Sequence, residues 1–161
     1  MSGVHNATNW LDNPFWRYSI KQYSQPECAS FLLNAQDHKQ LDVNILLFIG
    51  YISDRNLRLP NKGCLNKAII INFFLIRPIR WLRRMTKHRT PIGLYRWIKH
   101  VELKSEQLEQ GVLYRLAEQL KDTEKSLCFE RNLEIYMGKE EIEAIWLQAL
   151  KEYLQPDKDT N

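Results

Sequence analysis

Apolar residues recur along most of the chain at the three- and four-residue spacing of one helix face. The first such stretch begins at Asn13-Pro14, a pair that favours a helix start because Asn caps and Pro fits the first turn. It ends near Tyr23, and a second stretch after Pro26 places apolar residues at helical spacing: Cys28, Leu32 and Ala35. No stretch of the sequence shows sustained strand alternation. The pattern therefore predicts an all-α fold.

A third helix begins after Asp42, whose side chain can cap it. The run from Val43 to Ile49 is apolar on nearly every helical face, so we expect this helix to lie at the centre of the protein. Asn44 interrupts the run and requires a hydrogen-bond partner if it is buried.

Two longer helices follow and should pair. The first runs from about Leu65 to His88, and Pro78 should kink it near Phe74. The second starts at Thr90-Pro91 and carries an apolar stripe: Leu94, Ile98, Val101, Leu108, Val112, Leu116 and Leu120. The short connection between them favours a long antiparallel helical hairpin.

The C-terminal part predicts a polar turn over 122–130, a short helix over 132–137 and a last helix over 140–153. The sequence as a whole predicts a single helical domain over 1–161, an all-α bundle of about six helices with one central apolar helix. Residues 1–12 and 155–161 are expected to be flexible tails.

The composition agrees with a soluble globular protein, since 44% of the 161 residues are hydrophobic and 26% are charged. The longest apolar runs are too short to cross a bilayer, so no transmembrane segment is expected. The first residues lack the pattern of a secretory signal, and the three cysteines are far apart. These features favour a cytoplasmic protein.

The charge is concentrated in the middle of the chain. The formal net charge is +4, but no Asp or Glu occurs between Arg55 and Val101, where twelve Arg and Lys lie. Residues 102–161 carry eight basic and fourteen acidic side chains. The chain thus has a basic middle and an acidic end.

The basic residues of the first hairpin helix fall on one arc of a helical wheel, opposite Ile79, Leu82 and Met85. The hairpin turn brings the basic residues of both helices together. We therefore expect a cationic tip that binds the phosphate groups of RNA or DNA, or that binds a protein which carries nucleic acid. Three acids, Glu102, Glu106 and Glu109, are expected to lie too far along the hairpin to neutralise it. The predicted anion-binding residues are Arg77, Arg80, Trp81, Arg83, Arg84, Lys87, Arg89, Arg96 and Lys99.

Other interpretations of this charge stay open. The basic arc can be a solvated helix face that is partly paired with the C-terminal acids. It can belong to a protein–protein adaptor or a homodimer, where charge sets orientation and association rate. A membrane-surface role is a further alternative. It is disfavoured because the apolar arc is expected to pack in the core and would then be unavailable to a membrane.

A second candidate site is polar and internal. Gln36, Asp37, Asp42 and Asn44 lie around the turn between the second and third helices. They predict either a small polar pocket for a ligand or peptide, or a capping Asp with a hydrogen-bonded core Asn. In addition, Asp42 can meet Arg77 or Arg80 as a buried pair.

Catalytic and cofactor motifs are weak or missing from the sequence. The adjacent Asp37 and His38 could form a base with its orienting group, the basis of a small helical enzyme as a further hypothesis. The histidines and cysteines lack metal-ligand spacing, and no glycine-rich phosphate loop occurs. We therefore expect a binding protein rather than an enzyme, with no cofactor and no metal.

Three segments carry a resemblance to a known family. Residues 13–20 read NPFWRYSI, residues 41–48 read LDVNILLF, and residues 77–87 read RPIRWLRRMTK. They resemble an uncharacterised family of small proteobacterial proteins with the motifs FWxYSL, LQDxxGxDVNLLLF and PLRxxRRxLK. Gln40 stands where that family usually has Gly. The resemblance implies a bacterial cytoplasmic helical protein and assigns no catalytic residue.

Overall fold

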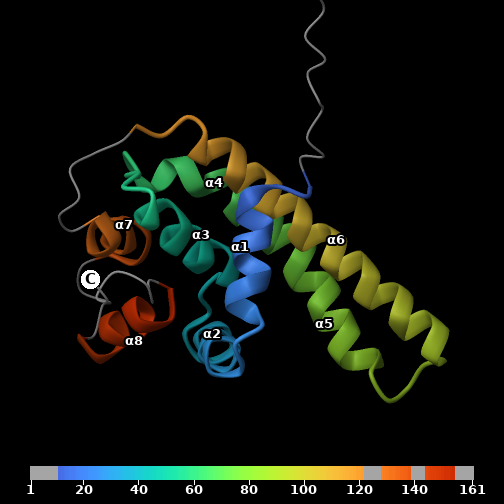
Figure 1. Cartoon of the computed structure of the whole chain (residues 1–161). Helices are drawn as coiled ribbons and strands as arrows, with labels where there is room; N and C mark the ends of the chain where they lie inside the picture. Colours follow the sequence, from blue (N-terminus) through green and yellow to red (C-terminus); the bar gives the residue numbers. More distant parts are fainter. Residues whose placement is uncertain (1–10, 122–127, 139–143, 155–161) are drawn as a thin grey trace, which may run out of the picture.

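The computed structural model describes residues 11–121, 128–138 and 144–154, and every regular element in them is a helix (Figure 1). The elements, in chain order, are α1 (Pro14–Tyr23), α2 (Pro26–Lys39), α3 (Val43–Asp54), a 3₁₀ turn (Lys62–Leu65), α4 (Asn66–Ile71), a π-helical turn (Asn72–Ile76), α5 (Arg77–Thr86), α6 (Ile92–Ala117), α7 (Cys128–Met137) and α8 (Ala144–Leu154). The predicted all-α class is confirmed.

Side-chain caps fix the starts of α1 and α3. The Oδ1 atom of Asn13 accepts a hydrogen bond from the Trp16 amide at 2.9 Å, and Asp42 accepts one from the Asn44 amide at 2.9 Å. Each cap satisfies an amide that has no partner within its own helix. These two starts are the ones that the sequence predicts, because the capping group and the amide are close neighbours in the chain.

The third helix lies at the centre of the fold, as predicted. Every residue of α3 from Val43 to Ser53 is buried, and α1, α2, α6, α7 and α8 all contact it (Figure 1). Phe48 meets Phe15 of α1 edge to face, with ring centroids 5.5 Å apart. One hydrophobic core therefore forms around a helix that has almost no solvent-facing side.

Gly50 allows the last helix to come close to α3. A Cβ atom at this position would lie 2.9 Å from the Leu154 Cβ and 2.6 Å from the Tyr18 hydroxyl. That hydroxyl donates a hydrogen bond of 2.8 Å to the Leu154 carbonyl, which joins the middle of α1 to the end of α8. The missing side chain makes room for this three-helix junction.

The turn between α2 and α3 holds a residue in the left-handed region. Gln40 has φ 56° at the end of α2, where glycine is the residue with least steric cost. The Gln40 carbonyl accepts a hydrogen bond from the Arg77 guanidinium at 2.9 Å, so the turn is tied to the start of α5.

Near Phe74, where the sequence predicts a kink, the fourth helix forms a π-helical turn. Residues 72–76 replace the α-helical pattern, and the Arg77 amide donates to the Asn72 carbonyl five residues back. Pro78 follows this turn in the sequence. In a regular α-helix its ring would clash with the carbonyl of Phe74. The wider turn relieves that clash and lets α5 follow α4 without a loop.

The long hairpin is confirmed. α5 and α6 run antiparallel, joined by residues 87–91, and their closed end projects away from α7 and α8 (Figure 1).

Some predicted boundaries differ from the structure. α6 begins at Ile92 rather than at Thr90-Pro91, because the Thr90 hydroxyl donates to the Thr86 carbonyl of α5 instead of capping α6. α7 includes Cys128 and Phe129, which lie within the predicted turn and are buried. Residues 122–127, the start of the predicted last helix (140–143) and most of the predicted tails (1–10 and 155–161) lie outside the described residues.

Candidate functional site

The side of the hairpin helix α5 that faces solvent differs from the side that the sequence predicts. None of its residues is buried. Trp81, Leu82 and Met85 expose 64%, 44% and 46% of their surface, whereas the Arg80 side chain exposes only 14%. The expectation that the apolar arc enters the core is therefore wrong, and the basic arc faces solvent only in part, since Arg77 and Arg84 are exposed while Arg80 is not.

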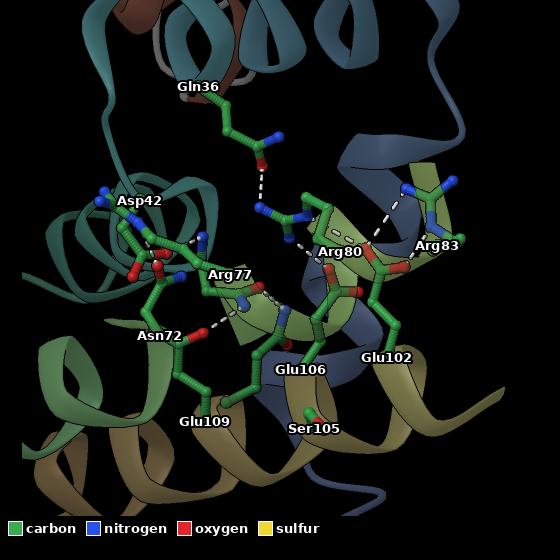
Figure 2. Close-up of polar contacts among 12 residues, drawn as sticks. Gln36, Asp42, Asn72, Arg77, Arg80, Arg83, Glu102, Ser105, Glu106 and Glu109 are labelled. Carbon is green, nitrogen blue, oxygen red and sulfur yellow. Dashed lines mark hydrogen bonds and ion pairs between the residues drawn. The ribbon is translucent and has the colours of Figure 1, made fainter. Parts of the chain in front are cut away.

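Arg80 uses all three of its guanidinium nitrogens in contacts with other helices. Its Nε donates to Glu102 at 3.0 Å, Nη1 donates to Gln36 at 2.6 Å, and Nη2 donates to Glu106 at 2.7 Å (Figure 2). Arg83 also donates to both oxygens of Glu102. We call these five residues the hairpin cluster. Its contacts overturn the expectation that Glu102 and Glu106 lie too far from the tip arginines.

The lean of helical side chains explains the error. Side chains in a helix tilt toward its N-terminus. Since α5 runs toward the hairpin turn and α6 runs away from it, Arg80 leans away from the turn and Glu102 leans toward it. The two groups converge although their backbone positions are offset along the hairpin.

The hairpin cluster is an ionised network. Burial raises the pKa of Glu106, and the adjacent Arg80 guanidinium opposes that shift. Burial alone would lower the pKa of Arg80, but the Glu106 and Glu102 carboxylates keep it above its usual value. The two positive and two negative charges cancel, so the cluster attaches α5 to α6 and α2 without leaving charge for a ligand.

A second polar group lies deeper, where α3 meets α6. Asn44 donates to the Glu109 carboxylate at 2.6 Å and accepts from the Gln110 amide at 2.7 Å, which confirms that this core Asn has partners. The Asp42 amide donates to the Tyr136 hydroxyl at 2.9 Å. Asn44 thus contacts both acids, since its backbone amide donates to Asp42 and its side chain donates to Glu109. We call Asp42 and Glu109 the buried acid pair.

Both acids of this pair are buried. Burial, and then the neighbouring Asp42, raises the pKa of Glu109 well above its usual value. Burial also raises the pKa of Asp42, against hydrogen bonds that include those from backbone amides. Both groups of the buried acid pair therefore hold a proton more readily than exposed carboxyl groups do.

Asp42 does not form the predicted pair with an arginine. The ion pairs found in the described parts of the chain join neither Arg77 nor Arg80 to it. Arg77 instead donates to the Asn72 side chain at 3.1 Å (Figure 2).

Three of the four predicted pocket residues line a common cavity. Gln36, Asp42 and Asn44 border a space of about 580 Å³ between α1, the start of α3, α5 and α6. Asp37 lies apart from it, and its carboxylate accepts a hydrogen bond from exposed Arg84 at 2.7 Å. His38, the proposed partner of Asp37 in catalysis, is exposed to solvent. The geometry thus separates Asp37 from the cavity.

Several residues of this cavity are missing from the sequence prediction: Ser19, Glu106 and Gln110 on its lining, and Glu109 behind it. The predicted stripe of α6 is only partly right in its first half, because Ile98 and Ser105 are buried as expected, whereas Leu94 is exposed and the acids Glu102 and Glu109 are buried. A usable signal was present, because acids at 102, 106 and 109 share a face at helical spacing, as do the arginines of α5.

The remaining predicted cations lie around the hairpin turn. Lys87, Arg89, Arg96 and Lys99 are exposed, and none of them forms an ion pair with a residue that the structure describes. The hairpin also exposes apolar side chains: Trp81, Leu82 and Met85 on α5 and Ile92, Leu94 and Trp97 on α6, preceded by Phe73, Phe74 and Leu75 in the π-helical turn.

The described helices include none long and apolar enough to cross a membrane. Within the same residues, no three His, Cys, Asp or Glu side chains gather as a metal site would require.

A model of one protein family matches residues 14–113, which span α1 to most of α6. The match includes the hairpin cluster, the buried acid pair and the cavity lining, and it ends before α7 and α8. Comparisons with curated proteins and with solved structures give no match. Since the match covers more than half of the 161 residues, the chain belongs to the family described as "Protein of unknown function (DUF2390)".

Proposed function

We propose that this is a non-enzymatic binding protein whose α5–α6 hairpin docks onto a partner protein. One observation carries the proposal: α5 buries none of its residues, because its arginines face α2 and α6 while its apolar arc faces solvent. At 100° per residue, Trp81, Met85 and Leu82 cover roughly 100° of the helix. Exposed apolar surfaces of this kind are typical of interaction sites.

The charge around this surface indicates the chemistry of the partner. The exposed cations Lys87, Arg89, Arg96 and Lys99 border it, and the nearest acids in the sequence, Glu102 and Glu106, are held in the hairpin cluster. A partner with an apolar strip bordered by Asp and Glu would complement both features. A second copy of this hairpin would place like charges together, so it fits less well.

Nucleic acid is the second candidate, and it fits only part of the surface. Trp81 and Trp97 could stack on bases, and the free cations could contact phosphates. However, Ile92, Leu94 and Met85 are aliphatic and exposed, and such side chains offer bases no stacking face. Arg80 and Arg83 are also engaged by glutamates. These facts favour a protein partner over RNA or DNA.

Photo-crosslinking from the hairpin tests the docking proposal. The full-length protein carries p-benzoylphenylalanine in place of Trp97, or in place of exposed Gln119 at the end of α6 as the control. We expect one protein crosslink at position 97 and none at 119. The partner, identified by mass spectrometry and purified, should bind at least tenfold more weakly to Trp97→Ala and to Arg96→Glu.

Other outcomes would overturn the proposal. A crosslink that disappears after nuclease treatment, together with salt-dependent RNA binding lost in Arg96→Glu/Lys99→Glu, would transfer the surface to nucleic acid. Flotation with anionic vesicles that Trp97→Ala abolishes would make it a membrane-surface site. The absence of any crosslink at position 97 would remove the docking role.

A further inference from the structure

The cavity beside α1 has the size and the apolar wall of a small-molecule site. Its volume of about 580 Å³ lies within the range of roughly 300–1,000 Å³ that is common for such sites. Trp16, Ile20 and Tyr23 of α1 form one wall, with Leu47 of α3 and Leu103 of α6 opposite. Ile20 and Leu103 expose 52% and 43% of their surface, which an occupant of the cavity would cover.

The polar part of the lining contains buried atoms that lack partners. The Oγ of Ser19, the Oε1 of Gln110 and the Oδ2 of Asp42 have no hydrogen-bond partner among the residues that the structure places. Ser19 and Gln110 expose only 4% and 3% of their surface. A buried polar atom that lacks a hydrogen-bond partner destabilises the fold. Because all three atoms can accept, a ligand that donates hydrogen bonds would satisfy them.

The charges around the cavity exclude an anionic head group. Arg80 reaches the lining, but its three nitrogens are already bound to Gln36, Glu102 and Glu106. The hairpin cluster sums to zero charge, and Asp42 adds a carboxyl group to the lining rather than a cation. A carboxylate or phosphate would therefore find acceptors and no unengaged cation, whereas an ammonium group would find acceptors that its N–H groups can satisfy.

We propose that this cavity binds a small amine, with its ammonium group hydrogen-bonded to Ser19, Asp42 and Gln110. The rest of the ligand is an aromatic or branched apolar body that packs against Trp16 and Leu47 and covers Ile20. The site is independent of the hairpin surface. A free amino acid fits less well, because its carboxylate would have no unengaged cation in the lining.

A set of three matched indoles tests the charge and the donor requirement. Tryptamine carries an ammonium group, tryptophol a hydroxyl, and indole-3-propionate a carboxylate on the same ring. Calorimetric titration of the full-length protein should show saturable one-to-one binding of tryptamine, binding of tryptophol at least tenfold weaker, and none of indole-3-propionate. Amide chemical-shift changes should be confined to the surroundings of Ser19, Leu47 and Leu103.

Matched variants locate the ammonium group. Ser19→Ala and Asp42→Asn should each weaken tryptamine binding at least tenfold, while Asp37→Asn, outside the cavity, should leave it unchanged. Asn is as good a helix cap as Asp, so α3 keeps its start. Ser19→Ala also removes an unsatisfied buried hydroxyl, so its melting temperature should not fall.

Equal binding of the three indoles would overturn the assignment of an amine. The absence of tryptamine binding at millimolar concentration, with all variants folded, would overturn the site itself. Shift changes centred on the hairpin instead of α1 would do the same.

Discussion

Two helices of similar length, α3 and α5, are held in the fold by different forces. All of α3 from Val43 to Ser53 is buried, whereas α5 buries none of its ten residues. Hydrophobic burial secures α3, since each apolar side chain there gains about 1.5–3 kcal/mol by leaving water. α5 is held instead by ion pairs and hydrogen bonds from its arginines to α2 and α6.

This difference shows how a helix can be fixed in place and still present an apolar surface. Because polar contacts position α5, its aromatic and aliphatic side chains remain available for another molecule. The same contacts make Arg80 a structural residue, so substituting it would disturb the hairpin as well as any binding. Variants that examine binding at the tip should therefore change Arg96 or Lys99.

The largest effect should come from truncating matched apolar side chains in the two helices. Phe48→Ala in α3 is expected to lower the free energy of unfolding by about 3 to 5 kcal/mol, because it leaves a cavity in the core. Met85→Ala in α5 should change it by less than about 0.5 kcal/mol, since the side chain faces solvent. Urea unfolding of both variants, followed by circular dichroism, measures the difference.

A large loss of stability in Met85→Ala would contradict the comparison. It would mean that the exposed face of α5 is covered in solution, and the oligomeric state of the wild-type protein would then have to be measured first. Equal m-values for the two variants would show that the denatured states are alike.

The next largest effect should come from the arginines of α5. Arg80→Ala leaves the largely buried Glu106 without its ion-pair partner and leaves Glu102 paired with Arg83 alone, so we expect a loss of about 3 kcal/mol. Arg84→Ala is the matched control, because its pair with Asp37 is exposed and should contribute less than about 1 kcal/mol. Thermal and urea unfolding of the two variants would check this contrast.

Double variants show whether the lost stability comes from the orphaned acids. Two double variants, Arg80→Ala/Glu102→Gln and Arg80→Ala/Glu106→Gln, should each recover part of the loss. Neutral amides tolerate burial better than unpaired carboxylates. If Arg80→Ala and Arg84→Ala lose the same amount, the hairpin cluster does not hold α5.

The sequence predicts the helices well wherever the deciding contacts are local. Asn13 and Asp42 cap their own helices, and the apolar run of α3 marks it as central, because each signal lies within a few residues of the element it specifies. The α5–α6 hairpin follows in the same way from a short connection between two long helices.

The sequence fails where the deciding contact is distant in the chain. The orientation of α5 depends on Arg80 meeting Glu102 and Gln36, which are 22 and 44 residues away. A helical wheel places the arginines on one arc but cannot show whether acids or solvent lie opposite. The buried acid pair likewise joins Asp42 to a residue that the predicted stripe of α6 leaves out.

The smallest and most specific effect concerns the buried acid pair. The pKa of Glu109 is raised in the folded protein by burial and by Asp42, so the folded state holds a proton that the unfolded state releases above its ordinary pKa of about 4.3. Stability should therefore decrease as the pH rises from that value through the folded-state pKa, by about 1.4 kcal/mol for each pH unit that separates the unfolded-state pKa from the folded-state pKa. Glu109→Gln has no such proton to lose, and its amide oxygen can still accept from Asn44. Its free energy of unfolding should lie close to that of wild type at pH 5 and rise above it at pH 9, whereas exposed Glu134→Gln should parallel wild type throughout. If the Glu109→Gln and wild-type curves run parallel from pH 5 to pH 9, the pKa of Glu109 is not raised in the folded protein.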